Sequence, residues 1–337
     1  MLRLTEDQRV RMRDMEFSQV LLFWLHNVKK PMVEENTFNN YCISLVKYEI
    51  PFFKRKKINL AALSQLDIQS FYDFLETKNL KANTILKHHS YIHDCLQWAW
   101  KEDLIQENYS EKVFLKPKEQ FVPNFLDINQ IPACLELFKN DPLELAVWIG
   151  LFLGFRRSEV IGLKWSQVDF ERKTITVKTV VVTSIDPITQ KAKILIKSKP
   201  KTTCSERTLP IPDRLLELLR WTKYTQELNQ KKYGDAYCTE YLGFVCVDER
   251  GYLLCPDYIS RHFRSVWDKS DLPYLRFHDL RHSCGSMLHY LGYDLQDIKD
   301  WLGHKDIRTT SNIYLHTGIM RKKQIVGSIN QMVSVNT

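Results

Sequence analysis

The phrase HDLRHSCGSML at residues 278–288 is the most distinctive in this chain, and LGHKDIRTTSNIYLH follows it at residues 302–316. His278 and Arg281 stand three positions apart, so on a helix both lie on the same face. Gly303 can end a helix and let the side chain of His304 turn into a site. The two phrases therefore predict basic side chains gathered at helix ends.

Two earlier phrases add further basic residues, GFRRSEVIGLKW at residues 154–165 and KPKTTCSERTLPIP at residues 199–212. Arg156 follows a glycine and an almost wholly apolar segment, and Glu159, three residues later, can hold it on one helix face. A guanidinium suits a phosphate oxygen because it stays charged and donates in a planar fork. Six residues can together bind a phosphodiester, stabilise the charge that builds at phosphorus and attack it with a phenol: Arg156, Lys201, His278, Arg281, His304 and Tyr314.

In this order and with these neighbours, the phrases resemble the tyrosine recombinase (phage integrase) family, over roughly residues 17 to 325. The resemblance implies that Arg156 and Arg281 clamp the phosphate and that Tyr314 forms a covalent 3′-phosphotyrosyl link. Lys201 would protonate the departing 5′ oxygen, with Lys197 and Lys199 as competitors for this role. His278 and His304 would contact the phosphate, and His278 could also move the tyrosine's proton.

Helical patterns in the first half, a β-rich segment at residues 174–183 and a return to helices predict a mainly α protein with a small antiparallel β-sheet. With the resemblance, this gives a helical core-binding domain and an α+β catalytic domain. The expected divisions are an N-terminal extension (1–16), a core DNA-binding domain (17–115), a linker (116–125), a catalytic domain (126–318) and a C-terminal tail (319–337). We expect the tail to dock on a neighbouring protomer.

A net charge of +8 in 337 residues is compatible with a polyanionic partner and is weak support by itself. A basic run in a probable loop, the polar side of a helix and two arginines of the catalytic domain supply candidate DNA contacts: Lys54, Arg55, Lys56, Lys57, Lys87, His88, Arg157 and Arg207. Arg157 can also be structural.

The remaining features exclude other classes of protein. No apolar run is long enough for a membrane span, and eight cysteines without a CxxC pair indicate reduced thiols in a cytoplasmic protein. No metal or cofactor is expected, because no Walker phrase or ligand cluster is present. Residues 1–16 are too short for the arm-binding domain that such integrases often carry, so the chain lacks that domain or is truncated.

The resemblance implies a site-specific recombinase that acts as a homotetramer on two DNA duplexes, with possible accessory DNA-bending or directionality factors. The long region between Thr174 and Ile211 favours a mobile-element integrase, and chromosome-dimer resolution is the alternative within the family. Two rivals come from other classes, a type IB topoisomerase and a non-catalytic DNA-binding relative. Strand exchange between two sites and covalent trapping would separate these possibilities.

Overall fold

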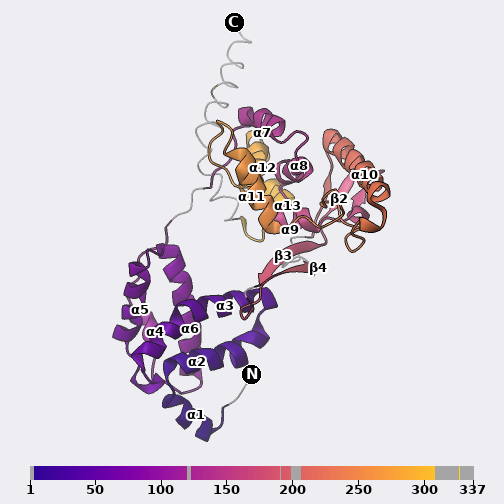
Figure 1. The fold of residues 1–337 in the computed structure, drawn as a ribbon. Helices are drawn as coiled ribbons and strands as arrows, with labels where there is room; N and C mark the ends of the chain where they lie inside the picture. Colours follow the sequence, from indigo (N-terminus) through magenta and orange to yellow (C-terminus); the bar gives the residue numbers. More distant parts are fainter. Residues whose placement is uncertain (1–3, 120–122, 190, 199–205, 308–325, 327–337) are drawn as a thin grey trace. The chain divides into compact units, whose positions relative to one another are not determined.

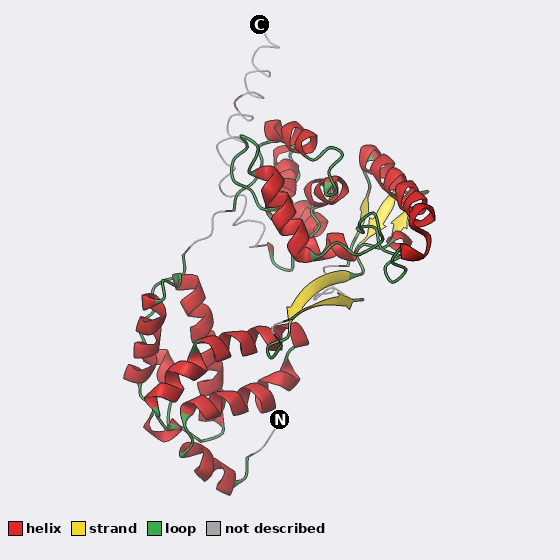
Figure 2. Ribbon diagram, in the orientation of Figure 1, coloured by secondary structure: helices red, strands yellow, loops and turns green. Residues whose placement is uncertain are grey.

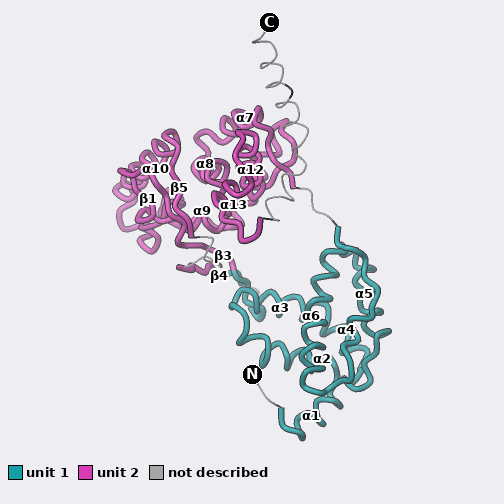
Figure 3. Tube along the Cα trace, turned by 180° about the vertical axis from the view of Figure 1, so that it is seen from behind, with its two compact units in different colours: residues 1–121, 184–193 teal, residues 122–183, 194–337 magenta. Residues whose placement is uncertain are grey.

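The computed structural model describes residues 4–119, 123–189, 191–198, 206–307 and 326 (Figure 1). The chain divides into two compact units, one of residues 1–121 and 184–193 and the other of residues 122–183 and 194–337 (Figure 3). Both are built mainly from helices, and the strands are few and short (Figure 2). This confirms the expected fold class. The described residues do not include Lys201 or Tyr314. They also leave out the expected tail, except for residue 326.

Unit 1 is a helical domain. Its main helices are α1 (Glu6–Arg13), α2 (Phe17–Phe23), α3 (Glu35–Lys47), α4 (Glu49–Lys56), α5 (Gln65–Thr77) and α6 (Ala82–Lys101). Short turns of other helix types complete it: η1 (Trp24–Lys29), η2 (Lys30–Met32), η3 (Leu60–Ala62) and η4 (Tyr109–Lys112). None of the helices in the described part of the chain is long and apolar enough to cross a membrane.

Aromatic side chains hold unit 1 together. Phe53 is fully buried and meets Phe17 edge to face, with ring centroids 4.8 Å apart. Phe71 of α5 packs on the same ring at 5.4 Å, so α2, α4 and α5 share one core. Each such ring contributes about 1.5–3 kcal/mol on burial. The start of α5 is fixed by a capping box between Ser64 and Asp67.

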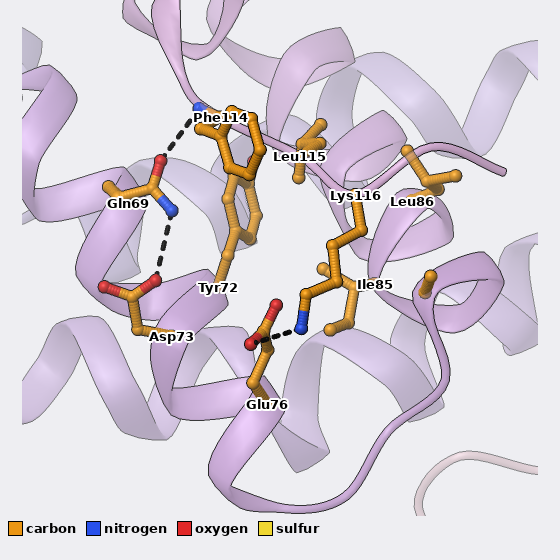
Figure 4. Close-up of a pocket in the computed structure, with 10 residues that line it drawn as sticks. Gln69, Tyr72, Asp73, Glu76, Ile85, Leu86, Phe114, Leu115 and Lys116 are labelled. Carbon is orange, nitrogen blue, oxygen red and sulfur yellow. Dashed lines mark hydrogen bonds and ion pairs between the residues drawn. The ribbon is translucent and has the colours of Figure 1, made fainter.

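The segment that leaves unit 1 is attached to α5 and α6 before it departs. Gln69 accepts a hydrogen bond from the Phe114 backbone at 2.8 Å, and Lys116 pairs with Glu76 at 2.8 Å. These four residues line a small pocket of about 160 Å³ (Figure 4). Further on, the Asn83 side chain exchanges two hydrogen bonds with the backbone of residue 119. The first residues of the expected linker 116–125 are therefore held against unit 1.

Unit 2 is a helical bundle with a sheet beside it (Figure 1). It contains η5 (Ile128–Gln130), α7 (Ile131–Leu137), α8 (Glu144–Phe152), α9 (Arg157–Gly162), η6 (Trp165–Gln167), α10 (Asp213–Tyr233), η8 (Gly234–Ala236), α11 (Pro256–Trp267), α12 (Asp279–Tyr290) and α13 (Leu295–Leu302). The apolar helix α8 lies in the core and packs closely on α12, where Gly150 leaves room for Leu280.

The strands form short pairs, and the pairing of β2 with β5 joins segments that are distant in sequence. In the three-stranded antiparallel sheet, β2 (Thr174–Thr176) lies between β1 (Val168–Asp169) and β5 (Thr208–Pro210), with Ile175 opposite Leu209. A second pair is formed by β3 (Val180–Ile185) and β4 (Ala192–Lys197). Pairing with β2 fixes the backbone of the residues just after the 199–205 segment, including Arg207, against the body of unit 2.

Candidate active site

Arg156 stands at the junction between the buried helix α8 and the short helix α9. Gly154, just before it, has φ +62°, a left-handed conformation that glycine adopts without strain. Arg156 is the N-cap of α9, and Glu159 in the first turn accepts a hydrogen bond from its backbone N–H at 2.9 Å. Glu159 Oε1 also accepts from Arg156 Nη1 at 2.6 Å. The sequence-based pairing of Arg156 with Glu159 is thus present in the structure.

Glu159 is buried, with 2% of its side chain exposed, yet it holds its charge. Burial alone would raise its pKa, but the positive charges of Arg207, Arg156 and Arg281 outweigh that effect and the pKa lies below its ordinary value. A buried carboxylate is tolerated only when it is paired and hydrogen-bonded. In the part of the chain that the structure describes, one carboxylate stands among three guanidinium groups, so this cluster has an excess of positive charge.

Arg281 lies in the first turn of α12 and is buried, with 2% exposed. Its guanidinium donates to the carbonyl oxygens of Gly154 and Leu302. Burial, with the charge of Arg156 nearby, lowers the pKa of Arg281 to about 9, so the group is protonated at neutral pH. Arg156, with a third of its side chain exposed, is the more accessible of the two.

The end of α13 organises the three arginines. Gly303 (φ +65°) closes the helix: its N–H bonds to the carbonyl of Asp300 at 3.2 Å, and the N–H of His304 bonds to the carbonyl of Lys299 at 3.0 Å. This is a Schellman cap, and it satisfies two of the carbonyls that a helix end leaves without partners. The next three carbonyls each accept from one arginine: Trp301 from Arg207 at 2.8 Å, Leu302 from Arg281, and Gly303 from Arg156 at 3.2 Å.

The two histidines flank this cluster in neutral form. His304 follows the cap and is buried; burial, then the charges of Arg281 and Arg156, lower its pKa to about 3. His278 is the N-cap of α12 and is exposed at the surface. Its pKa is also lowered, first by partial loss of hydration and then by Arg281. A neutral imidazole can donate from one ring nitrogen and accept at the other, which suits phosphate contact and proton movement.

The structure thus brings together four of the six expected catalytic residues around the α13 end: Arg156, His278, Arg281 and His304. Lys201 and Tyr314 lie outside the described residues, as does Lys199. The sequence patterns did not reveal the carbonyls of residues 154 and 301–303, because a backbone acceptor carries no side-chain signal. The glycines at 154 and 303 were the available signal that the backbone is special here.

Two of the expected DNA contacts, and the expected loop around the basic run, need correction. His88 is 3% exposed and hydrogen-bonds through Nδ1 to Glu49 at 2.6 Å, so it belongs to the core of unit 1. Arg207 is also buried, because its guanidinium pairs with Glu159 at 3.2 Å and with the carbonyl of Trp301. The basic run 54–57 was expected in a loop, but it forms the last turn and cap of α4, where cations favour the negative end of the helix dipole.

The other candidates keep accessible positions or acquire a structural partner. The four residues of the basic run and Lys87 are exposed. Arg157 is half-buried, and its Nη1 donates to the carbonyl of Pro256 at 3.1 Å and to the hydroxyl of Ser260. It therefore joins α9 to α11, in agreement with the structural alternative given to it above.

Comparisons with known proteins identify the family of this chain. A model of the phage integrase family matches residues 124–319, and a model of the phage integrase SAM-like domain matches residues 16–115. A tyrosine recombinase XerC-like protein of Caldanaerobacter subterraneus subsp. tengcongensis is 26% identical over 339 residues, which cover 96% of this chain and 85% of that protein. The ICEBs1 integrase of Bacillus subtilis (strain 168) is 25% identical over 338 residues, covering 97% of this chain and 86% of the integrase.

Among solved structures, a Tn1549 transposon integrase in complex with a circular intermediate DNA has a TM-score of 0.71 at 17% identity, covering 92% of this chain and 99% of that one. A lambda integrase dimer bound to a COC′ core site has a TM-score of 0.63 at 16% identity, covering 89% and 95%. At these identities the likeness concerns the fold alone. The first family model, however, spans more than half of the sequence and includes the arginines and histidines of the α13 cluster, so this chain belongs to the phage integrase family.

Proposed function

We propose that this chain is a site-specific DNA recombinase that cuts and rejoins duplex DNA through a 3′-phosphotyrosyl intermediate. The observation that carries the proposal is the cluster at the end of α13, where three guanidinium groups surround one carboxylate. A phosphodiester carries negative charge, which would balance the excess of positive charge in this cluster. Preorganised donors of this kind stabilise charge that builds up in a transition state.

In the proposed reaction the phenol oxygen of Tyr314 attacks the phosphorus, and the bond from phosphorus to the 5′ oxygen breaks. Lys201 gives a proton to the departing 5′ oxygen, and neutral His278 accepts the proton of the phenol. Arg156 and Arg281 bind the nonbridging oxygens. The phosphotyrosyl bond keeps the energy of the broken linkage. A 5′ hydroxyl from the partner strand can therefore attack the phosphorus, lose its proton and restore the phosphodiester, while the bond to Tyr314 breaks and the phenol takes up a proton.

Integration or excision of a mobile element is the biological role that we propose. It is supported by the similarity to the ICEBs1 integrase and by the fold shared with the Tn1549 transposon integrase. We further propose that four protomers act on two duplexes. In support, a lambda integrase tetramer bound to a Holliday junction shares the fold, with a TM-score of 0.65 at 15% identity.

Covalent trapping tests the proposal without knowledge of the natural target. The full chain is incubated with a library of nicked duplexes of randomised sequence, and denaturant-resistant protein–DNA species are recovered and sequenced. We expect adducts that map to Tyr314 and are enriched in one sequence, and none with Tyr314→Phe, which keeps the ring. Binding without adducts would favour a non-catalytic relative. Relaxation of supercoiled DNA with no strand exchange between two selected sites would favour topoisomerase activity.

A further inference from the structure

Arg207 has a place in the cluster that the proposed catalytic set does not explain. It follows the 199–205 segment and comes directly before β5, and its carbonyl accepts from the backbone of Val177 at 2.9 Å. The sheet therefore fixes its backbone, while its side chain, 7% exposed, extends into the core. An arginine is buried this far only when its donors are satisfied.

We propose that Arg207 is a positioning residue for DNA cleavage. It holds the Glu159 carboxylate and the end of α13 in the geometry that presents Arg156 to the scissile phosphate, and it acts through these groups rather than on DNA. This inference rests on the recombinase function proposed above.

The contacts of Arg207 join three separate segments of unit 2. Nη2 donates to Glu159 Oε2 at 3.2 Å, Nε donates to the carbonyl of Trp301 at 2.8 Å, and the guanidinium lies over the ring of Phe155 at 5.0 Å. Two different nitrogens of the Arg207 guanidinium therefore donate to two different acceptors at the same time. A lysine keeps the charge but has a single nitrogen on a flexible stem, so it cannot reproduce this fork.

The link from Arg207 to Arg156 runs through a shared carboxylate. Glu159 Oε2 accepts from Arg207 and from the backbone N–H of Arg156, while Oε1 accepts from the Arg156 side chain. The terminal torsion of a glutamate is soft, so the plane of the carboxylate is set by its donors. Among the positive charges that lower the pKa of Glu159, that of Arg207 has the strongest effect. Loss of Arg207 should therefore loosen the orientation of Arg156.

A second link runs through the backbone at the end of α13. Arg207 holds the carbonyl of Trp301, and the carbonyls of the next two residues, Leu302 and Gly303, hold Arg281 and Arg156. A shift of the helix end would move both phosphate-binding arginines together. Displacement of a catalytic group by about 1 Å can cost about 100-fold in rate.

The test compares Arg207→Lys with wild type and with Arg214→Lys, a matched control whose exposed side chain pairs with Glu217 on α10. DNA affinity and single-turnover cleavage are measured on a nicked duplex selected by the wild-type protein. We expect Arg207→Lys to bind within about threefold of wild type and to cleave about 100-fold more slowly. Arg214→Lys should match wild type in both. In the double variant Glu159→Gln, Arg207→Lys, cleavage should be no slower than in the slower of the two single variants. The reason is that both changes disrupt the same interaction between Arg207 and Glu159.

Three results would overturn the inference. The first is cleavage by Arg207→Lys at the wild-type rate, and the second is an equal loss of affinity and rate, which would indicate direct DNA contact. The third is a loss of rate in the double variant equal to the product of the losses in the two single variants. If Arg207→Lys does not fold, Phe155→Leu keeps the arginine, removes its aromatic support and leaves an apolar side chain in the core. It should then cleave about tenfold more slowly at unchanged affinity, and an unchanged rate would refute the role. Failure of the wild-type chain itself to form adducts would contradict the recombinase proposal instead.

Discussion

Gly154→Ala should damage the arginine cluster from a position that bears no functional side chain. Gly154 has φ +62°, and a Cβ built there would lie 2.3 Å from Leu302 Cδ2 and 3.3 Å from Cys284 Sγ. Leu302 is fully buried, so its side chain has little space into which it can move. The two residues in conflict, 154 and 302, are also the two whose carbonyls hold Arg281.

The expected size of the effect follows from two separate costs. A non-glycine residue in the left-handed region costs about 1–2 kcal/mol, and overpacking of a filled core costs about 1–3 kcal/mol. The free energy of unfolding of unit 2 should therefore fall by roughly 2–5 kcal/mol, which for a domain of this size lowers Tm by roughly 4–20 °C. Where the variant is still folded, displacement of Arg281 should slow cleavage about 100-fold.

Thermal unfolding and single-turnover cleavage measure these two effects, and Gly292→Ala is the matched control. Gly292 also has a positive φ, +96°, but its Cβ would meet nothing within 4 Å. It should carry only the backbone cost of about 1–2 kcal/mol and should cleave normally. If Gly154→Ala is as stable and as active as Gly292→Ala, the close contact between residues 154 and 302 does not constrain the site.

Three further predictions concern the chemistry. Arg156→Lys should bind DNA nearly normally but lose about 100-fold or more in cleavage rate, because lysine lacks the planar fork; equal cleavage rates would make Arg156 structural. Lys201→Ala should recover on DNA whose leaving 5′ oxygen is replaced by sulfur, since a thiolate departs without protonation; equal defects on both substrates would move the acid role to Lys197 or Lys199. The free protein should lose stability as pH falls from about 7 to about 5: the pKa of His304 drops from 6.5 to about 3 on folding, so in this window only the unfolded chain binds the proton. His304→Asn should remove about 2 kcal/mol of that loss, and an unchanged pH dependence of Tm would contradict the buried neutral imidazole.

Local sequence predicted much of the site because its main residues stand at helix ends. The pairing of Arg156 with Glu159, the helix start at His278 and the helix end at Gly303 depend on neighbours within a few positions. Spacing and capping rules describe such features well. The mainly helical fold with a small sheet followed from the same periodicity, together with the resemblance in the four phrases.

The wrong predictions concern basic residues whose environment is set by distant parts of the chain. Arg207 is one of the candidate DNA contacts, yet its side chain is buried and its partner Trp301 lies 94 positions away. His88 is buried for the same reason, since its partner Glu49 stands 39 positions earlier. Periodicity identifies the face of a helix that carries a polar residue, but it does not show whether another helix supplies a carboxylate there.

The choice of partners in the cluster explains how three arginines can be held close together and still attract phosphate. If each guanidinium were paired with its own carboxylate, the site would be neutral and would give an anion little reason to bind. Among the acceptors that the described residues offer to the three arginines, Glu159 is the one that carries negative charge, and the others are main-chain carbonyls, most of them at the negative end of α13. Carbonyls orient a guanidinium without cancelling its charge, and the helix dipole offsets part of the repulsion among the three groups. The incoming phosphate then supplies the missing negative charge, and the charge that develops during cleavage meets donors that are already in place.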